Sequence, residues 1–435
     1  CISGDIVLKK LSRLDTKKSC GYDNFSAKLI KICAPAIYRP LTYLFNSCIT
    51  LSYFPQTMKC AEVAPAYKKG NNLSKTNYRP ISVLTVFSKL YEDLFCDQLK
   101  SYFCNILSHR LATYKKGIGC PQVLLKCIED WKGALDDGNY VGAILMDLSK
   151  AFDALPNPLL IAKLSAYGLS TDACSFLRNY LSHRKQRVKI GGHRSEWSIL
   201  TKGVPQGSIA GPLLFNVFIN DLFYGFNDDC QIYNYADDNT LSCYSPNFDT
   251  MKRTLEKCSV QAVEWFETNS MQANPAKFQA IIFENRGNPV SDDFVFEIKG
   301  HIVKPSKSVK LLGVHIDSTL SFTDHVSSLT KKAAYQINAL GRVTRWLNVR
   351  SKTNVLNSFI SSNFLYAPLA WHMCKITDTK KIEKHNERAL RLVYNDFEMS
   401  YNELLRKANK DSLYIQRQQM LMVEVFKCVN GLSPP

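Results

Sequence analysis

Three aspartates occupy positions where carboxylates could bind a metal ion. Asp147 follows the continuously apolar segment 141–146, whose pattern is that of a central strand buried on both faces. Further along, Asp237, Asp238 and Asn239 connect two short β-rich runs, which predicts a tight hairpin with both aspartates at its tip. If the hairpin lies beside the strand, the three carboxylates converge and repel one another unless a cation neutralises them. Oxygen-only ligands suit Mg²⁺.

Such a site would suit one class of reaction. Two Mg²⁺ ions about 4 Å apart would activate a 3′-hydroxyl and stabilise a leaving pyrophosphate in nucleotidyl transfer. A second doublet, Asp228 and Asp229, provides a comparison within the chain, because no buried strand leads into it and Gly225 precedes it. We interpret that doublet as a solvated loop. The pairing of the Asp237 doublet with a buried strand is what distinguishes it.

The elements that must position these residues follow from the apolar periodicity. Strands alternate with helices in the middle of the chain, and helices dominate both ends, with a helical pattern from Ser321 onward. The loop 203–208 leads into a helix whose Pro212 suits a first turn. Other predicted helices are 25–37, 88–103, 158–167 and 251–267, and other predicted strands are 278–283 and 309–316. This order predicts a mixed α/β fold.

The composition and net charge of the chain limit the kinds of partner that we expect it to bind. The chain has 435 residues, of which 46% are hydrophobic and 21% charged, so it is globular and long enough for two or three structural units. An excess of Lys and Arg (55 against 38 Asp and Glu) gives a net charge of +17, which favours a nucleic acid as partner over an anionic membrane surface. We expect no bilayer-spanning segment and no membrane partner, because the apolar runs are too short.

Fifteen cysteines include no C-x-x-C pair, and the eight histidines do not cluster near them. We therefore expect neither a zinc finger nor a disulfide framework, and we interpret the thiols as buried core residues in a reducing intracellular compartment. The chain opens at Cys1, shows no signal peptide and closes on Pro434 and Pro435, so we expect it to be a piece of a longer protein.

Six segments of the sequence, taken in order, resemble one family. They are "NYRPISVL" (77–84), "GAILMDLSKAFDAL" (142–155), "KGVPQGSIAGPLLFNVFINDL" (202–222), "YADD" (235–238), "NPAKFQAIIF" (274–283) and "VKLLGVHID" (309–317). They resemble motifs of the reverse transcriptases of non-LTR (LINE-type) retrotransposons, and jockey-like elements in particular. The resemblance implies an α/β (α+β) right-hand polymerase with a palm sheet and packed helices, fingers, and a helical thumb. It divides the chain into an N-terminal helical extension (1–52), fingers and palm (53–316) and a thumb with the C-terminal region (317–435).

The resemblance assigns Asp147, Asp237 and Asp238 to the catalytic metals, which would be two Mg²⁺ ions with Mn²⁺ as a substitute. Phe152 resembles the aromatic residue that rejects a ribose 2′-hydroxyl, and a core phenylalanine is the alternative. For Asp153, capping or salt-bridging a helix start is favoured over metal binding.

Other residues are assigned to the nucleotide. Gln206 and Gly207 lie in a Gly-flanked loop where backbone approaches closely, and the resemblance implies contact with the incoming nucleotide; a plain turn is the alternative. Lys68, Lys69 and Arg79 resemble residues that grip the triphosphate, although a surface lysine pair is usually only solvated.

Two further features concern proton transfer and duplex binding. Lys277 resembles the lysine proposed to protonate the pyrophosphate, with a strand-edge charge as the alternative. Four thumb cations are placed to contact phosphates: Lys331, Lys332, Arg342 and Arg345. Lys115 stands where the family usually has arginine, so a contact made there loses the bidentate fork of a guanidinium.

We therefore predict an RNA-directed DNA polymerase whose partners are an RNA template, a DNA primer and deoxynucleoside triphosphates; no oligomeric state is predicted. The resemblance alone implies a nuclear location or a cytoplasmic ribonucleoprotein. A catalytically decayed, nucleic-acid-binding remnant is the alternative, opposed by the intact Asp147, Asp237, Asp238 and Gln206. An RNA-dependent RNA polymerase is disfavoured by Phe152 and by Ala236, where that class typically has glycine.

Overall fold

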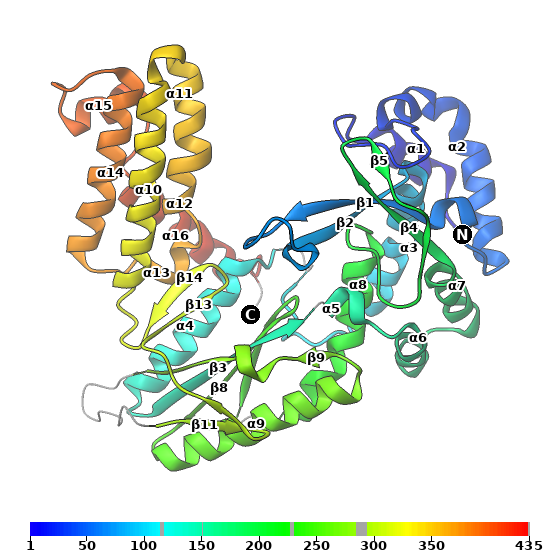
Figure 1. Ribbon diagram of the computed structural model, residues 1–435, viewed down its shortest axis with the longest axis horizontal. Coiled ribbons are helices and arrows are strands. Elements are labelled where there is room, and N and C mark those ends of the chain that lie inside the picture. Colours follow the sequence, from blue (N-terminus) through cyan, green and yellow to red (C-terminus); the bar gives the residue numbers. More distant parts are fainter. Residues whose placement is uncertain (114–116, 150, 227–229, 284–293, 434–435) are drawn as a thin grey trace. The chain divides into compact units, whose positions relative to one another are not determined.

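The structure is a computed structural model that describes residues 1–113, 117–149, 151–226, 230–283 and 294–433 (Figure 1). Lys115 and the doublet Asp228–Asp229 lie outside these residues. The chain forms two compact units built from interleaved segments: unit 1 is Cys1–Leu111, Leu148–Gly225 and Ala262–Ala273, and unit 2 is Ala112–Asp147, Phe226–Gln261 and Asn274–Pro435. The division into extension, fingers and palm, and thumb is a functional one and stays a prediction.

Unit 1 contains a sheet flanked by helices. Its strands follow the order β2-β1-β4-β5, with β6 paired to β4. The strands are β1 (Cys60–Tyr67), β2 (Tyr78–Leu84), β4 (Arg184–Ile190), β5 (His193–Arg194) and β6 (Ser198–Leu200). The helices are α1 (Gly4–Ser12), α2 (Ala27–Thr50), α3 (Val86–Phe103), α5 (Ala151–Ala154), α6 (Asn157–Ala166), α7 (Thr171–Leu181) and α8 (Ala210–Ile219). Serine or threonine side chains cap the first turns of α2, α3 and α7, as expected of residues that accept a bond from an unpaired helical N–H.

A buried ionic cluster fixes strand β1 to its neighbour β4. The Glu62 carboxylate is buried, and it accepts bonds from Arg187 at 2.6 Å and Arg194 at 2.8 Å, while the Lys189 ammonium lies 3.1 Å away. Burial opposes ionisation of Glu62, but the three cations outweigh it and hold the pKa of this carboxyl at about 2. The strand that leads to Lys68 is therefore held by charge as well as by its backbone ladder.

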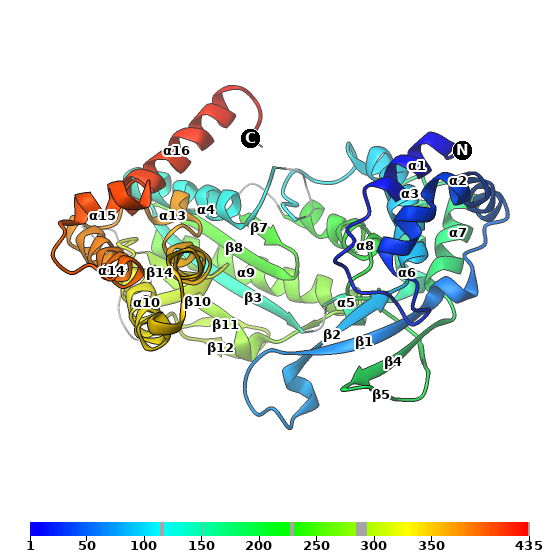
Figure 2. The same cartoon turned by 90° about the horizontal axis from the view of Figure 1, so that it is seen from above.

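The sheet of unit 2 is antiparallel, with strand order β10-β3-β8-β7 (Figure 2). These strands are β3 (Tyr140–Ser149), β7 (Gln231–Tyr235), β8 (Asp238–Ser245) and β10 (Gln279–Phe283). The predicted central strand at 141–146 is thus confirmed as β3, which has neighbours on both sides. Its last two residues, Leu148 and Ser149, already belong to unit 1 and pair there with β9 (Gln272–Ala273).

Each face of this sheet has its own helix. On one face, the Trp131 indole of α4 (Cys120–Asp136) donates to Ser242 Oγ at 2.8 Å, and its ring packs against Phe283 with centroids 4.6 Å apart. On the other face lies α9 (Phe248–Thr268): a Cβ added to Gly142 would be 2.7 Å from Met251 Sδ. Because the side chains of a strand point alternately to the two faces of the sheet, α4 and α9 contact opposite sets of β3 and β8 residues.

The segment predicted as one strand at 309–316 is a hairpin. Strands β13 (Ser308–Leu311) and β14 (Val314–Asp317) pair around Leu312 and Gly313, and both turn residues have positive φ (45° and 89°). A two-residue turn of this kind matches the twist of a hairpin. A second short hairpin pairs β11 (Phe296–Ile298) with β12 (His301–Val303).

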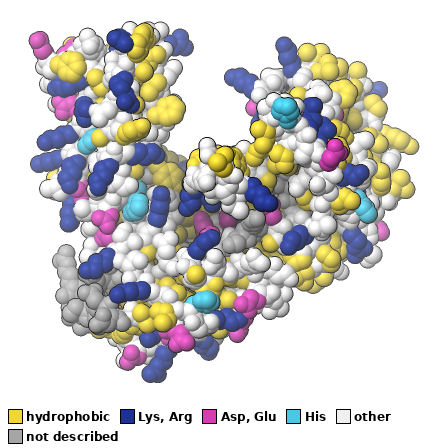
Figure 3. Space-filling view, in the orientation of Figure 1, with side chains coloured by type: hydrophobic (Ala, Val, Ile, Leu, Met, Phe, Trp, Pro, Cys, Tyr) yellow, Lys and Arg dark blue, Asp and Glu magenta, His cyan; other side chains and the backbone are white. Residues whose placement is uncertain are grey.

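Helices make up the rest of unit 2, as predicted from Ser321 onward. The main ones are α10 (Thr323–Val343), α11 (Val349–Val355), α13 (Pro368–Trp371), α14 (Ile376–Tyr394), α15 (Tyr401–Ala408) and α16 (Leu413–Val429). An apolar stripe of α10 faces the core: Val326, Ala333, Ile337 and Leu340 are buried and Leu329 is half-buried. Lys and Arg side chains gather over α10 and α14 in Figure 3. Among the described residues, no helix combines the length and the apolar character needed to cross a bilayer.

Candidate active site

Two of the predicted metal ligands face each other across adjacent strands. Strands β3 and β8 are antiparallel, and the last pair of their ladder is Asp147 with Asp238. Side chains directly opposite one another have Cβ atoms about 4.5–5.5 Å apart and share one face of the sheet. Both aspartates are exposed. Register therefore creates a pair of like charges, which is unfavourable without a counterion.

The third aspartate lies in the turn that precedes β8. Strand β7 ends at Tyr235, which pairs with Asp238, so the connection is Ala236 and Asp237. The predicted turn at 237–239 was wrong by one residue, because Asp238 begins the strand and Asn239 lies inside it. Asp237 is half-buried. Among the described residues, the three carboxylates do not form a group with all ligand atoms within 4.8 Å. The three carboxylates lie at one end of the sheet, but their oxygen atoms do not all surround one common position.

The turn holds an alanine where glycine would be easier to place. Ala236 has φ 57°, a region that costs an L-residue about 1–2 kcal/mol. Its backbone N–H donates to Thr113 Oγ1, and its carbonyl accepts from Asn234 Nδ2 at 2.9 Å. The same Asn234 amide donates to Asn239 Oδ1 at 3.0 Å. These bonds fix the turn beside the carboxylates.

The residues that support the turn were missed in the sequence. Asn234 and Asn239 are each 1% exposed, and Thr113 is 3% exposed. A buried amide needs hydrogen-bond partners, so two asparagines flanking the aspartate doublet were a usable signal of a supported turn. Thr113 carried no such signal, because it is far from the hairpin in sequence.

Lys277 lies at the same end of the sheet, on the other side of β3. It closes the short 3₁₀ helix Pro275–Lys277 (η4) and is exposed. Strand β10 starts two residues later, with Gln279 paired to Leu145 of β3. Because the strands are antiparallel, the backbone before Gln279 runs toward the Asp147 end. Fold and register thus bring Lys277, Asp147, Asp237 and Asp238 to one end of one sheet, all in unit 2.

The residues predicted to bind the nucleotide all belong to unit 1. Gln206 Nε2 donates to both carboxylate oxygens of Asp153, each at 2.9 Å, and the Gln206 carbonyl accepts from the Ser82 N–H at 2.7 Å. Gly207 has φ 114°, and a Cβ there would lie 2.7 Å from the Ser82 carbonyl oxygen. The loop is therefore held against β2. Asp153, predicted to cap or salt-bridge a helix start, orients this amide.

Phe152 shows features of both of its interpretations. Its ring stacks on the buried Phe215, with centroids 4.5 Å apart and planes at 26°. The residue is nevertheless only half-buried. Its backbone carbonyl accepts from Val204 N–H at 3.0 Å, which ties it to the Gln206 loop. A ring that is packed on one side and accessible elsewhere is a rigid steric element.

Lys68, Lys69 and Arg79 gather at one end of the β1–β2 hairpin and are all exposed. Lys68 N–H donates to the Asn77 carbonyl at 2.8 Å, which extends the ladder by one pair, and Arg79 is the second residue of β2. Alternation puts Lys68 and Arg79 on the same face. The tip is thus an exposed cationic surface suited to a polyphosphate.

Residues 67–316 match the family described as reverse transcriptase (RNA-dependent DNA polymerase). This match covers more than half of the chain. The chain belongs to the reverse transcriptase family. The mixed α/β class predicted for it is confirmed, with a sheet packed between helices and a helical C-terminal region.

Curated relatives of this reverse transcriptase come from mobile elements. It is 26% identical over 404 residues to the probable RNA-directed DNA polymerase from transposon BS of Drosophila melanogaster, covering 89% of this chain and 44% of that protein. It is 25% identical over 405 residues to the RNA-directed DNA polymerase from mobile element jockey of Drosophila funebris, covering 89% and 43%. These matches confirm the resemblance to non-LTR, jockey-like elements. The chain spans less than half the length of these relatives.

Among solved structures, telomerase from Candida albicans in complex with a fragment of telomeric RNA aligns with a TM-score of 0.42 and 12% identity, covering 84% of this chain and 68% of that one.

Reverse transcriptases use divalent metal ions, and the carboxylate end of the unit 2 sheet fits that requirement. Its donors are all oxygens, the type that hard cations prefer. The register of β3 and β8 sets two of them face to face, so a cation would remove the repulsion that the fold builds in. Asp147 and Asp238 are exposed, so an ion from solvent can reach both carboxylates.

Proposed function

We propose that this chain is an RNA-directed DNA polymerase that extends a DNA primer 3′-hydroxyl on an RNA template. The observation that carries the proposal is the register of β3 and β8, which pairs Asp147 with Asp238 beside Asp237 in a member of the reverse transcriptase family. These three side chains would hold two Mg²⁺ ions, with Mn²⁺ as a substitute. When bound, the ions supply Lewis-acid activation of the hydroxyl and charge neutralisation at the leaving pyrophosphate.

The chain's own residues have separate tasks in this proposal. The Gln206 amide, oriented by Asp153, and the backbone at Gly207 contact the incoming nucleotide. Phe152 excludes a ribose 2′-hydroxyl because stacking on Phe215 holds its ring in place. Lys68, Lys69 and Arg79 bind the triphosphate, since cations at that position offset its charge. Lys277 Nζ gives its proton to the departing pyrophosphate.

The partners follow from charge. A net charge of +17 favours a nucleic acid, and α10 carries exposed Lys331, Lys332 and Arg342 that can track a phosphate backbone. Contacts of that kind are independent of base sequence and weaken as salt rises. The chain therefore binds an RNA–DNA duplex through backbone and shape.

Primer extension tests the proposal. The chain and its Asp237→Ala variant are given an RNA template, a DNA primer, deoxynucleotides and Mg²⁺, with Glu264→Gln, an exposed carboxylate change on α9, as the control. We expect extension by the parent and the control and none by Asp237→Ala, with duplex binding equal in all three. If the parent binds the duplex and does not extend the primer, the chain is a catalytically decayed remnant and the proposal fails.

A further inference from the structure

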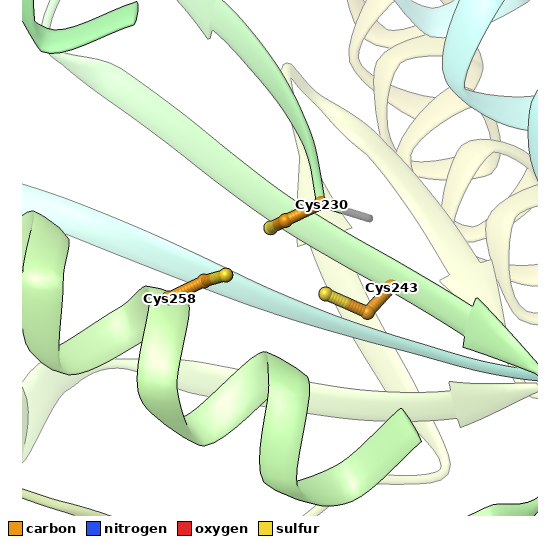
Figure 4. Close-up of side chains that lie close together, drawn as sticks. All are labelled: Cys230, Cys243 and Cys258. Atoms are coloured by element: carbon orange, nitrogen blue, oxygen red, sulfur yellow. The ribbon is translucent and has the colours of Figure 1, made fainter. Parts of the chain in front are cut away.

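Three cysteines outside the carboxylate site converge on one point in unit 2. The Sγ atoms of Cys230, Cys243 and Cys258 all lie within 4.8 Å of one another (Figure 4). Their residues are 1%, 1% and 9% exposed. Within the described part of the chain, it is the one group of three or more His, Cys, Asp or Glu residues whose ligand atoms all lie within 4.8 Å of one another. Sequence reasoning treated these thiols as separate core residues.

Strand register explains the first two members. Cys230 immediately precedes β7, whose first residue Gln231 pairs with Ser242 of β8. Cys230 is therefore placed beside Cys243, the next residue of β8. Since both come from neighbouring positions on adjacent strands, their side chains leave the sheet close together, as Figure 4 shows.

Helix α9 delivers the third thiol. Cys243 pairs across the ladder with Gly142 of β3, so it faces the same side as Gly142, where α9 lies. A Cβ on Gly142 would be 2.7 Å from Met251 Sδ and 3.0 Å from Leu255 Cδ2, so the missing side chain is what lets α9 approach. Cys258 follows Met251 by two helical turns and points to the same side.

The spacing of the sulfurs is near that of a metal–thiolate centre. With metal–sulfur bonds of about 2.3 Å, tetrahedral or trigonal geometry puts ligand sulfurs about 3.8–4.0 Å apart. The three sulfurs lie within 4.8 Å of one another, so side-chain shifts below about 1 Å would close them around an ion.

We propose that Cys230, Cys243 and Cys258 form a structural site for one thiophilic metal ion of the zinc class. Three soft sulfur donors select Zn²⁺ over the Mg²⁺ that the aspartates suit, so the two sites do not compete for one ion. Binding releases the three thiol protons to solvent and leaves three thiolates on the metal.

The site would act on the hairpin that carries Asp237 and Asp238. Cys243 is five residues along β8 from Asp238, or about 17 Å at the rise of a strand. A metal held by residues before β7, within β8 and within α9 would clamp the base of this hairpin to the helix. Because a one-residue slip turns every side chain to the other face, such a clamp protects the register that pairs Asp238 with Asp147.

Metal content of the full chain tests the site without reference to polymerase activity. The protein is stripped with a chelator under reducing conditions, dialysed against Zn²⁺ and then against metal-free buffer, and its zinc is measured by mass spectrometry. We expect one zinc per chain in the parent, loss in Cys258→Ser and Cys243→Ser, and retention in Cys127→Ala. Cys127 is an equally buried thiol of the same unit that belongs to no three-ligand group among the described residues.

A second measurement covers the case in which a serine variant does not fold. Co²⁺ added to the stripped parent should give sulfur-to-metal charge-transfer absorption that saturates at one equivalent and is displaced by Zn²⁺. Three results would overturn the inference: no zinc retained by the folded parent, equal retention in folded Cys258→Ser, or a Cys230–Cys243 disulfide in the reduced-state preparation. Failure of primer extension would leave this site untouched, because no step of the test uses it.

Discussion

Replacing Asp238 with asparagine should have opposite effects on stability with and without Mg²⁺. In metal-free buffer, Asp147 and Asp238 are like charges in directly opposite positions of β3 and β8, and such pairs cost about 0.2–1 kcal/mol. Both side chains are exposed, so water screens them and about 0.5 kcal/mol is the reasonable size. Asp238→Asn should therefore be more stable than the parent by about that amount in chelator at low salt.

Mg²⁺ should reverse this order. An ion that binds only the folded chain stabilises it by RT ln(1 + [Mg²⁺]/Kd), which is about 1.4 kcal/mol at ten times Kd. The parent gains this stabilisation, whereas Asp238→Asn has lost one anionic ligand and gains less. The two variants should then exchange rank between chelator and saturating Mg²⁺. In 1 M salt the difference in chelator should vanish, because the Debye length falls to about 3 Å.

Urea unfolding measures this directly, with each chain titrated in chelator and in Mg²⁺. Glu264→Gln serves as the control, because it removes an exposed carboxylate from α9 and should follow the parent in both buffers. The reasoning is refuted if Asp238→Asn is the less stable chain in chelator, or if Mg²⁺ stabilises the parent and Asp238→Asn equally. The first result would mean that the carboxylates do not repel, and the second that the ion binds elsewhere.

Three further predictions concern the turn, the nucleotide loop and the ionic cluster. Ala236→Gly should keep primer extension, whereas Ala236→Val, a β-branched residue at positive φ, should lower the free energy of unfolding in urea by about 1–2 kcal/mol; equal stability would contradict the strain argument. Asp153→Ala frees the Gln206 amide and should raise KM for deoxynucleotides about tenfold in steady-state kinetics, with an unchanged KM speaking against a positioning role. Glu62 has a folded pKa of about 2 against an ordinary 4.5, so its stabilisation is present above pH 4.5 and is lost as pH falls toward 2. Glu62→Gln should flatten the fall in urea stability between pH 5 and 2, and an unaltered profile would exclude Glu62 as its source.

Much of the site could be predicted because its residues are marked by patterns in the local sequence. The apolar run that became β3 ends in an aspartate, and the hairpin that carries Asp237 is bounded by β-rich runs. The turn was displaced by one residue because Ala236 gives no sign of the positive φ it adopts. Asn239 is polar and was predicted in the turn, yet it is buried in β8 and bonded to Asn234. Secondary-structure propensity depends on side-chain type and therefore favours a turn at Asn239. In the folded chain, the hydrogen bond with Asn234 satisfies the Asn239 amide inside the strand.

The cysteine group could not be predicted from the sequence, and the reason is a different one. Metal-binding cysteines are usually recognised by close spacing in sequence, but these three lie far apart in it: Cys230 immediately before β7, Cys243 in β8 and Cys258 in α9. Their convergence depends on the β7–β8 register and on the space left at Gly142, neither of which is a property of local sequence. Likewise, nothing near Asp153 indicated that its carboxylate would meet Gln206 across an intervening stretch of chain.

The spacing between Asp238 and Cys243 also restricts how the length of β8 can change. The two residues are an odd number of positions apart, so the carboxylate leaves one face of the sheet and the thiol leaves the other, toward α9. Deleting or inserting one residue between them must turn either the acid into the helix contact or the thiol onto the acidic face. A change of two residues preserves both orientations. Viable length variants of this strand should therefore come in even steps, a parity rule that no single substitution would reveal.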